Sequence, residues 1–351
     1  MITKPMDVLS LHPIRKTKVQ KAAFRDDVVL YLKSFGYDVE VQSGDFGAKN
    51  VIVGNPKSAK ILVTAHYDTP ARLPFPNLIT PCHAFPFIVY QLLLTVLLFI
   101  IPALAWIVAG HFGQPDIGRY MASVLFFVEM GFMLFGPSNK TNANDNTSGV
   151  VTLLNIAKDV PVDSRSAVCF VLFDLEEAGL IGSASHAQKY AGYAKQQICL
   201  NLDCVGDGNN IVLFPSGKLK KDDARMSWLN QMVSNLDDKS IVVREKGFSY
   251  YPSDQQNFTY GVGIAALNKT ERGWLYCDKI HTKNDVILDE RNVSYLSTKI
   301  IDLICNSAML PELTAVKEKH KLKRWQLFLL YMTISIVGGM LFGMALVYLF
   351  P

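Results

Sequence analysis

The sequence predicts an α/β protein, in which a sheet is covered by helices on both faces, together with three helices that cross a membrane. The first observation is that short apolar runs typical of buried strands alternate with helical patterns along most of the chain. The second is composition. Hydrophobic residues make up 50% of the 351 residues and the mean hydropathy is positive, whereas charged residues reach only 19%, so part of the chain is expected to lie in lipid.

The first part of the soluble domain precedes residue 71. Residues 18–35 carry apolar side chains at helical spacing and predict an amphipathic helix. Residues 60–64 form an apolar run typical of a buried central strand, which delivers His66 and Asp68 just past its C-terminal end. Residues 70–86 contain five prolines and predict a loop.

Two long apolar runs interrupt the soluble pattern. Residues 87–109 have about the length that crosses a hydrocarbon core of ~30 Å, and residues 117–135 form a second such run that contains Glu129, to which no role is assigned. The link of residues 110–116 is short, so the pair predicts a transmembrane hairpin. The alternative is a pair of buried core helices.

A third apolar run at residues 325–350 follows a basic segment and predicts the last span. By the positive-inside rule this segment lies in the cytoplasm, and because the hairpin crosses twice, both parts of the soluble domain share that side. The N-terminus lacks the apolar run of an export signal, and the six cysteines form no CxxC pair, which favours reduced thiols. We therefore expect a multi-pass protein of the cell membrane with a cytoplasmic soluble domain. The basic residues are Lys317, Lys319, Lys321, Lys323 and Arg324.

The soluble pattern resumes after residue 140, so the predicted organisation has four parts. Residues 1–70 and 141–316 are the two parts of the soluble domain, 71–140 the inserted loop and hairpin, and 317–351 the basic segment with the last span. In the second part, strands are predicted at 167–174, 198–203, 210–214, 241–244 and 262–267, and helices at 148–158, 181–194, 224–236 and 289–307.

Five segments place an acid or a histidine at the end of a predicted strand or in an adjoining loop. In open α/β sheets, ligands collect outside the carboxyl ends of the strands, so these segments are expected to converge. Imidazole and carboxylate ligands suit zinc, and a two-metal site needs about five protein ligands with one shared carboxylate. The segments contain His66, Asp145, Glu176 with Glu177, Asp203 and His281.

Each of these residues also has a structural interpretation when taken alone. His66 is compatible with a core histidine, Asp145 with a helix N-cap, and the two glutamates with a solvated loop. Asp203 follows an apolar strand and would be a costly buried charge without a cation. Asp68 lies two residues after His66, on the same face of an extended chain, where its carboxylate can orient the imidazole.

Taken together, the order His-x-Asp at 66–68, Asn-Asp-Asn-x-Ser-Gly at 144–149, Glu-Glu, Asp and His resembles the co-catalytic di-zinc aminopeptidase family. That family includes bacterial leucyl aminopeptidases, glutamate carboxypeptidases, glutaminyl cyclases and the transferrin receptor. The resemblance covers residues 38–70 and 140–308, and the segment 253–258 is similar to the Ser-Asp-His-x-x-Phe segment of the family, with Gln255 in place of the histidine. The transmembrane hairpin is a further departure.

The resemblance implies a mixed, mainly parallel central sheet and two bound Zn²⁺ ions. It assigns Glu176 as the general base that takes a proton from a metal-activated water and gives it to the leaving amine, and Asp68 as the residue that orients His66. The implied ligands are His66 and Asp203 for one ion, Glu177 and His281 for the other, and Asp145 as the bridge between them.

These residues favour a membrane-anchored zinc exopeptidase, above all an aminopeptidase, with peptides as substrates and the lipid bilayer as a partner. A carboxypeptidase or glutaminyl cyclase of the same fold is the first alternative, although Arg244 and Arg272 form no cluster in sequence to grip a substrate carboxylate. A non-catalytic receptor or assembly protein is the second, and a transporter is disfavoured by the few polar residues in the spans.

A net charge of +4 does not favour nucleic acid as a partner. A homo-oligomer stays open, and Tyr250 or Tyr251 is a candidate oxyanion donor, with loop packing as its alternative.

Overall fold

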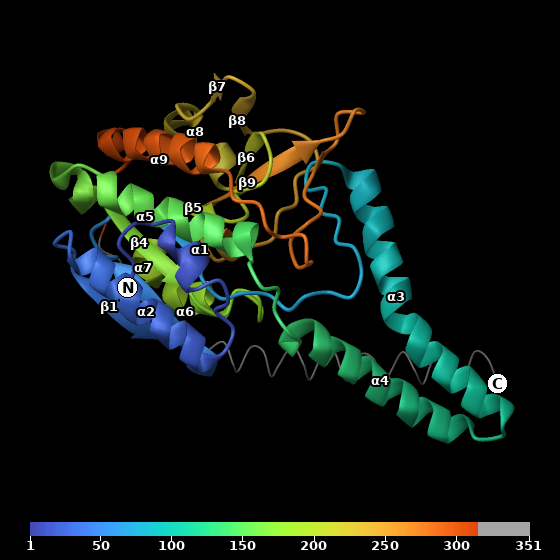
Figure 1. Cartoon of the computed structure of the whole chain (residues 1–351). Helices are drawn as coiled ribbons and strands as arrows, with labels where there is room; N and C mark the ends of the chain where they lie inside the picture. Colours follow the sequence, from blue (N-terminus) through green and yellow to red (C-terminus); the bar gives the residue numbers. More distant parts are fainter. Residues whose placement is uncertain (315–351) are drawn as a thin grey trace. The chain divides into compact units, whose positions relative to one another are not determined.

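The computed structural model describes residues 1–314, and its centre is a ten-stranded mixed sheet (Figure 1). Four neighbouring strands, in the order β4-β3-β5-β9, run parallel, and β6 is parallel to β8, whereas the other pairs are antiparallel. The predicted α/β fold with a mixed sheet is confirmed. In sheet order the strands are β1 (Val39–Ser43), β2 (Lys49–Val53), β4 (Val168–Phe173), β3 (Ile61–His66), β5 (Ile198–Leu202), β9 (Tyr260–Lys269), β6 (Asn210–Pro215), β8 (Lys239–Val243) and β7 (Ser234–Leu236), with β10 (Leu275–Tyr276) beside β9.

Helices cover both faces of the sheet. On one face α2 (Lys18–Lys33), α5 (Gly149–Asp159), α8 (Asp223–Asn230) and α9 (Glu290–Cys305) share the largest apolar core with alternate strand residues such as Val63 and Leu200. On the other face α6 (Ile181–Lys189) and α7 (Ala191–Ala194) pack on the intervening residues, such as Leu62 and Cys199. This alternation follows from the period of two in a strand. The short helix α1 (Asp7–Leu11) precedes α2.

The start of α2 is fixed by local side-chain chemistry. The Thr17 side chain accepts a hydrogen bond from the Gln20 backbone N–H, and the Gln20 side chain accepts one from the Thr17 N–H. This reciprocal capping box satisfies two of the N–H groups that a helix start leaves unpaired, so the helix begins at Lys18, as predicted.

Three predicted boundaries are wrong. The helix expected over 181–194 is interrupted at Tyr190. The helix expected over 224–236 ends at Asn230, because residues 234–236 pair with β8 around a tight turn in which Asp237 has a φ of 53°. The loop expected to reach residue 86 ends earlier, since α3 starts at Ala84. Pro86 is tolerated there because the first turn of a helix leaves its N–H groups unpaired.

The hairpin of two apolar helices is present. α3 (Ala84–His111) and α4 (Pro115–Phe135) lie side by side, and both are long and apolar enough to cross a membrane (Figure 1). Only 6% of the most apolar window of each helix is buried, which contradicts the alternative of two core helices. The third predicted span, at 325–350, lies outside the described residues.

Candidate metal centre

The parallel strands β4, β3 and β5 bring acids and a histidine to one edge of the sheet. His66 is the last residue of β3, Glu176 and Glu177 follow β4, and Asp203 directly follows β5. The carboxyl ends of adjacent parallel strands meet at the same edge, so these side chains converge. His66 Nε2 lies 3.6 Å from Asp203 Oδ1, and one ligand atom each of His66, Glu176 and Asp203 lies within 4.8 Å of the other two.

Asp145 lies between the two histidines. It belongs to a turn at residues 143–148 that leads into α5. Its Oδ1 is 3.3 Å from His66 Nε2, and its Oδ2 is 3.0 Å from His281 Nε2, which in turn lies 3.6 Å from Glu177 Oε2. The two oxygens of one carboxylate therefore point to separate groups of donor atoms, as a bridging ligand requires.

Asp68 contacts both the histidine and the glutamate loop. Its Oδ1 is 3.6 Å from His66 Nδ1, and its carbonyl oxygen is 3.2 Å from the same nitrogen. Its carboxylate also accepts hydrogen bonds from the backbone N–H groups of Glu176 (3.1 Å) and Glu177 (3.2 Å). Asp68 thus fixes the backbone that carries the two glutamates, in addition to facing His66.

The donor set fits metal ions. Asp145 Oδ1 is shielded from solvent and accepts no hydrogen bond from any described residue, which is a costly state for a buried oxygen without a cation. The surrounding donors are imidazole nitrogens and carboxylate oxygens, the set that zinc prefers when thiolates are absent. Cys204 Sγ also lies near Asp145 and Asp203, but it donates to Asp203 Oδ1 at 3.1 Å.

The pKa values of the buried acids and of His66 are shifted by their neighbours. Burial, together with neighbouring acids, raises the pKa of both Glu176 and Glu177 well above the usual range of a glutamate. Burial opposes the charge of His66, but Glu176, Asp145 and Asp203 outweigh it and raise the pKa of that imidazole well above its usual value.

Asp285 is a site residue that the sequence did not reveal. Its carboxylate is 1% exposed and accepts hydrogen bonds from the backbone N–H groups of Asn144 (2.6 Å) and Asp145 (3.1 Å). It therefore orients the turn that carries the central carboxylate. Burial, with the nearby Asp145 charge, raises the pKa of Asp285 to about 7. The one sequence signal is its position, four residues after His281.

Arg15 is a second residue that sequence reasoning missed. Its side chain is fully buried, and its guanidinium donates to the Tyr67 carbonyl at 2.5 Å and to Thr147 Oγ1 at 3.1 Å. It joins the segment that follows His66 to the turn that contains Asp145. Burial lowers the pKa of Arg15 to about 10, against the opposing charges of Asp68, Asp145 and Asp285, so it stays a cation beside the acids.

Gln255 and Tyr251 pack beside the centre. Gln255 Oε1 accepts from Asn201 Nδ2 at 3.1 Å, and its amide nitrogen donates to the Tyr251 carbonyl at 2.6 Å, so it has a structural role where the family pattern has histidine. The Tyr251 hydroxyl donates to the Asp203 carbonyl at 3.0 Å, which places it next to a predicted metal ligand. Tyr250 is 47% exposed.

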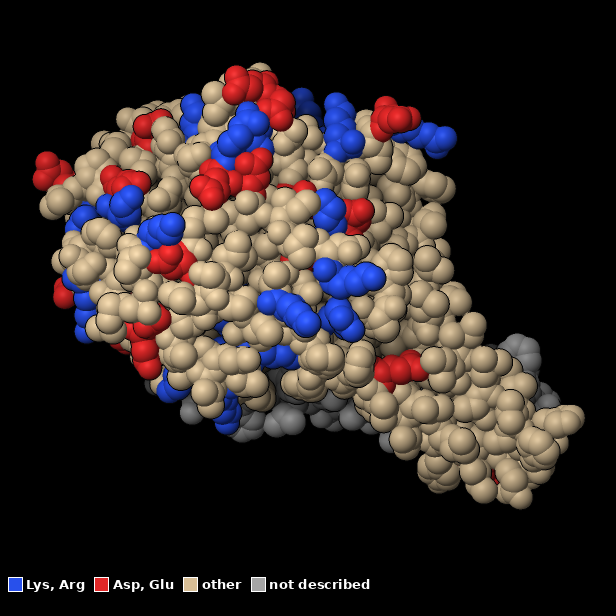
Figure 2. Space-filling model, in the orientation of Figure 1, with Lys and Arg blue, Asp and Glu red and all other residues tan. Residues whose placement is uncertain are grey.

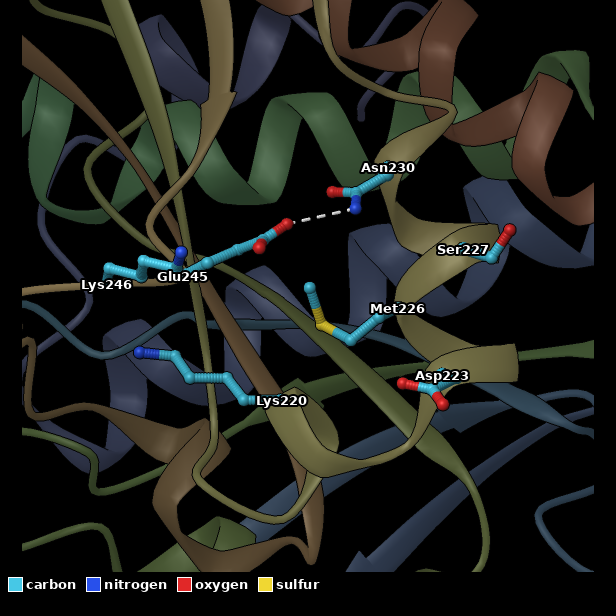
Figure 3. Close-up of a pocket in the computed structure, with 7 residues that line it drawn as sticks. All are labelled: Lys220, Asp223, Met226, Ser227, Asn230, Glu245 and Lys246. Carbon is cyan, nitrogen blue, oxygen red and sulfur yellow. Dashed lines mark hydrogen bonds between the residues drawn. The ribbon is translucent and has the colours of Figure 1, made fainter.

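A separate hollow of about 500 Å³ lies beside α8 and contains none of the predicted site residues (Figure 3). Two of the residues that line it are hydrogen-bonded to each other, since Asn230 Nδ2 donates to Glu245 Oε1 at 3.0 Å. The hollow is therefore no part of the centre. Its lining consists of Lys220, Asp223, Met226, Ser227, Asn230, Glu245 and Lys246.

The sheet and the cluster at its edge define a zinc-peptidase type of protein. The sequence pattern of peptidase family M28 matches residues 120–301, more than half of the chain, and the chain belongs to this family. The predicted family resemblance is confirmed. Comparison with curated proteins gave no match.

Solved structures of the same fold include proteins with different activities. A glutaminyl cyclase from Porphyromonas gingivalis superposes with a TM-score of 0.53 at 18% identity, over 87% of this chain and 96% of that one. The LapA aminopeptidase of Legionella pneumophila gives 0.52 at 12% identity, over 88% and 69%. A Zn-dependent exopeptidase from Parabacteroides distasonis gives 0.51 at 15%, over 86% and 95%. These likenesses show the fold, and membership of the peptidase family supports a hydrolase.

Proposed function

We propose that this protein is a membrane-anchored, zinc-dependent exopeptidase that removes N-terminal residues from peptides. The observation that carries the proposal is the position of Asp145, whose two carboxylate oxygens face His66 at 3.3 Å and His281 at 3.0 Å. A glutamate with no other assigned role, Glu176, lies in the same cluster. Membership of a peptidase family supports hydrolysis.

Two zinc ions fit the donor atoms of the cluster. In the proposed assignment His66 and Asp203 hold one ion, Glu177 and His281 hold the other, and Asp145 is shared by both. The distances from His66 to Asp203 (3.6 Å) and from His281 to Glu177 (3.6 Å) support this division. When bound, two zinc ions supply Lewis-acid polarisation of a peptide carbonyl and make water acidic enough to attack near neutral pH.

Glu176 is the proposed general base and acid. One of its oxygens lies within 4.8 Å of donor atoms of His66 and Asp203. In this position its carboxylate takes a proton from the attacking water and gives it to the departing amine. Asp68 is a positioning residue, because it holds the Glu176 and Glu177 N–H groups at 3.1 and 3.2 Å.

Membrane anchoring is proposed from three apolar segments. α3 and α4 expose almost all of their apolar side chains, which favours lipid contact over water. The sequence of residues 325–350 adds a third span, and the basic residues before it favour a cytoplasmic peptidase domain. The protein would then be a multi-pass protein of the cell membrane.

A substrate panel tests the proposed activity on detergent-purified full-length protein. The panel contains aminoacyl-p-nitroanilides, the same compounds with blocked amines, a peptide with N-terminal glutamine and a peptide with a free C-terminus. We expect hydrolysis of free-amine substrates only, loss of activity with a chelator and recovery with zinc. Cyclisation of the glutamine peptide would indicate a glutaminyl cyclase, and release of C-terminal residues would indicate a carboxypeptidase. Absence of any turnover by the zinc-loaded protein would favour a non-catalytic role.

A further inference from the structure

Solvent reaches the centre from one side. The side chains of His66 (1% exposed), Asp145 (4%) and Asp203 (9%) are closed off, whereas Glu177 is 15% and His281 27% exposed. Glu176 is half-buried as well, so a peptide end must enter beside the two glutamates and His281. We call this the open side of the centre.

The first membrane helix is bonded to the loop that forms the open side. In the second turn of α3, the Tyr90 hydroxyl donates to the Pro76 carbonyl at 2.7 Å. The next residue, Asn77, is buried and donates from Nδ2 to the Ile280 carbonyl at 3.1 Å, immediately before His281. The Leu73 N–H donates to the His281 carbonyl at 2.8 Å.

The second membrane helix ends at the same side. Lys16 Nζ donates to the Leu134 carbonyl in the last turn of α4 at 3.3 Å. Just beyond α4, Thr141 Oγ1 donates at 2.6 Å to the carbonyl of Asp285.

The surface around the open side has the chemistry of a lipid contact. Arg72, Lys140 and Lys283 are exposed, and they lie in the segments that join the hairpin or follow His281. In the last of these segments Val286 is 57% and Ile287 39% exposed. Exposed cations beside exposed apolar side chains suit the headgroup region of an anionic bilayer. Figure 2 shows that the hairpin carries few charged side chains and that basic side chains lie on the adjoining face.

We propose that the centre opens at the bilayer surface and acts on the free N-termini of polypeptides that are themselves held in the membrane. The inference rests on the proposed aminopeptidase function and names its substrate class. The location at the bilayer surface follows from the hydrogen bonds of Tyr90, Asn77 and Lys16, which connect both apolar helices to the loops that border the open side. An extended chain spans about 3.3–3.6 Å per residue, so a centre at the surface is reached by a short spacer, whereas one ~50 Å away needs roughly 15 residues.

A ladder of spacer lengths measures the distance between the centre and the bilayer. Full-length protein in nanodiscs with phosphatidylglycerol is given peptides with one N-terminal sequence, polar spacers of graded length and an apolar C-terminal anchor, together with the same peptide without the anchor. Mass spectrometry identifies the last residue removed. We expect trimming to continue to within roughly five residues of the anchor.

The outcomes separate the two proposals. If trimming stops about 15 or more residues from the anchor, or if the soluble peptide is cleaved with the same kcat/KM as the anchored one, the surface location is wrong and the aminopeptidase function stands. If aminoacyl-p-nitroanilides are hydrolysed but neither peptide is cleaved, the substrate class is wrong. If no substrate is hydrolysed, the proposed function itself fails.

A charge-reversal variant tests the contact with anionic headgroups. The triple variant Arg72→Glu, Lys140→Glu, Lys283→Glu is expected to cleave the anchored peptide several-fold more slowly than wild type, with unchanged hydrolysis of a soluble nitroanilide. The matched control is Lys57→Glu, an exposed lysine that precedes β3, at the end of the strand opposite to His66. Equal rates for wild type and the triple variant would contradict the contact.

Discussion

Removal of the Asp285 carboxylate is expected to weaken zinc binding without removing a ligand. The residue accepts hydrogen bonds from the Asn144 N–H at 2.6 Å and the Asp145 N–H at 3.1 Å and is 1% exposed. In Asp285→Ala both N–H groups lose a charged acceptor in a buried place. Asp285→Asn keeps the shape and one acceptor oxygen, but turns an amide donor toward an N–H group.

The magnitude follows from these two bonds. A hydrogen bond to a charged group contributes about 1.5–3 kcal/mol, so at a pH well above 7, where Asp285 is ionised, Asp285→Ala is expected to lower the free energy of unfolding of the metal-free protein by roughly 3–6 kcal/mol. Partners that hold a metal ligand in place typically contribute 10-fold to 100-fold to metal affinity. We expect a loss of that size for the alanine variant and a smaller loss for the asparagine variant.

Competition with a chromophoric chelator measures the zinc affinity, and thermal unfolding measures stability. The matched control is Asp222→Ala, which removes the cap at the start of α8, where Asp222 Oδ1 accepts from the Arg225 N–H at 3.1 Å. It should lose about 1 kcal/mol of stability with unchanged zinc affinity. Zinc binding by folded Asp285→Ala within twofold of wild type would show that Asp285 does not hold the turn that carries Asp145.

Three further predictions concern stability. Asp174 is 1% exposed and lies 2.7 Å from Lys21 Nζ, so Lys21→Met leaves a buried carboxylate without its cation. The free energy of unfolding in urea should fall by about 3–5 kcal/mol. An equal loss for an exposed-lysine variant would count against a role for burial. Burial lowers the pKa of His186 from 6.5 to about 3, so between these values the unfolded chain binds a proton that the folded chain does not. The free energy of unfolding therefore falls as pH drops from 6.5 toward 3, by at most about 5 kcal/mol. His186→Gln should flatten this pH dependence, and an unchanged slope would contradict the assignment. Removal of zinc by a chelator should lower the free energy of unfolding by about 2.7 kcal/mol relative to protein in free zinc at 100 times Kd, and an unchanged melting temperature would exclude stabilising metal.

The candidate ligands were predictable because their signal is local. His66, Asp145 and Asp203 each sit where an apolar strand or a helix start meets a loop, and parallel strands bring such positions to one edge. The order of residue types along the chain then adds a family pattern. The family, and the convergence of these side chains, were therefore predictable without knowing any contact.

The remaining features depend on contacts between distant parts of the chain. Asp285 acts on a turn 140 residues earlier in the chain, and Arg15 bonds to Thr147, 132 residues later, so nothing near either residue marks it. The helix predicted over 224–236 fails for a related reason. Residues 234–236 form an edge strand only because β8 is available to pair with them, and pairing overrides local propensity.

In the proposed mechanism Asp145 organises a two-metal centre and Glu176 is the general base. The most direct test measures zinc content and aminopeptidase activity of Glu176→Gln and Asp145→Asn beside wild type. We expect Glu176→Gln to keep about two zinc ions per chain and to lose about 10²–10⁴-fold in kcat, and Asp145→Asn to lose metal. A Glu176→Gln enzyme with wild-type kcat, or an Asp145→Asn protein with full zinc content, would contradict the account.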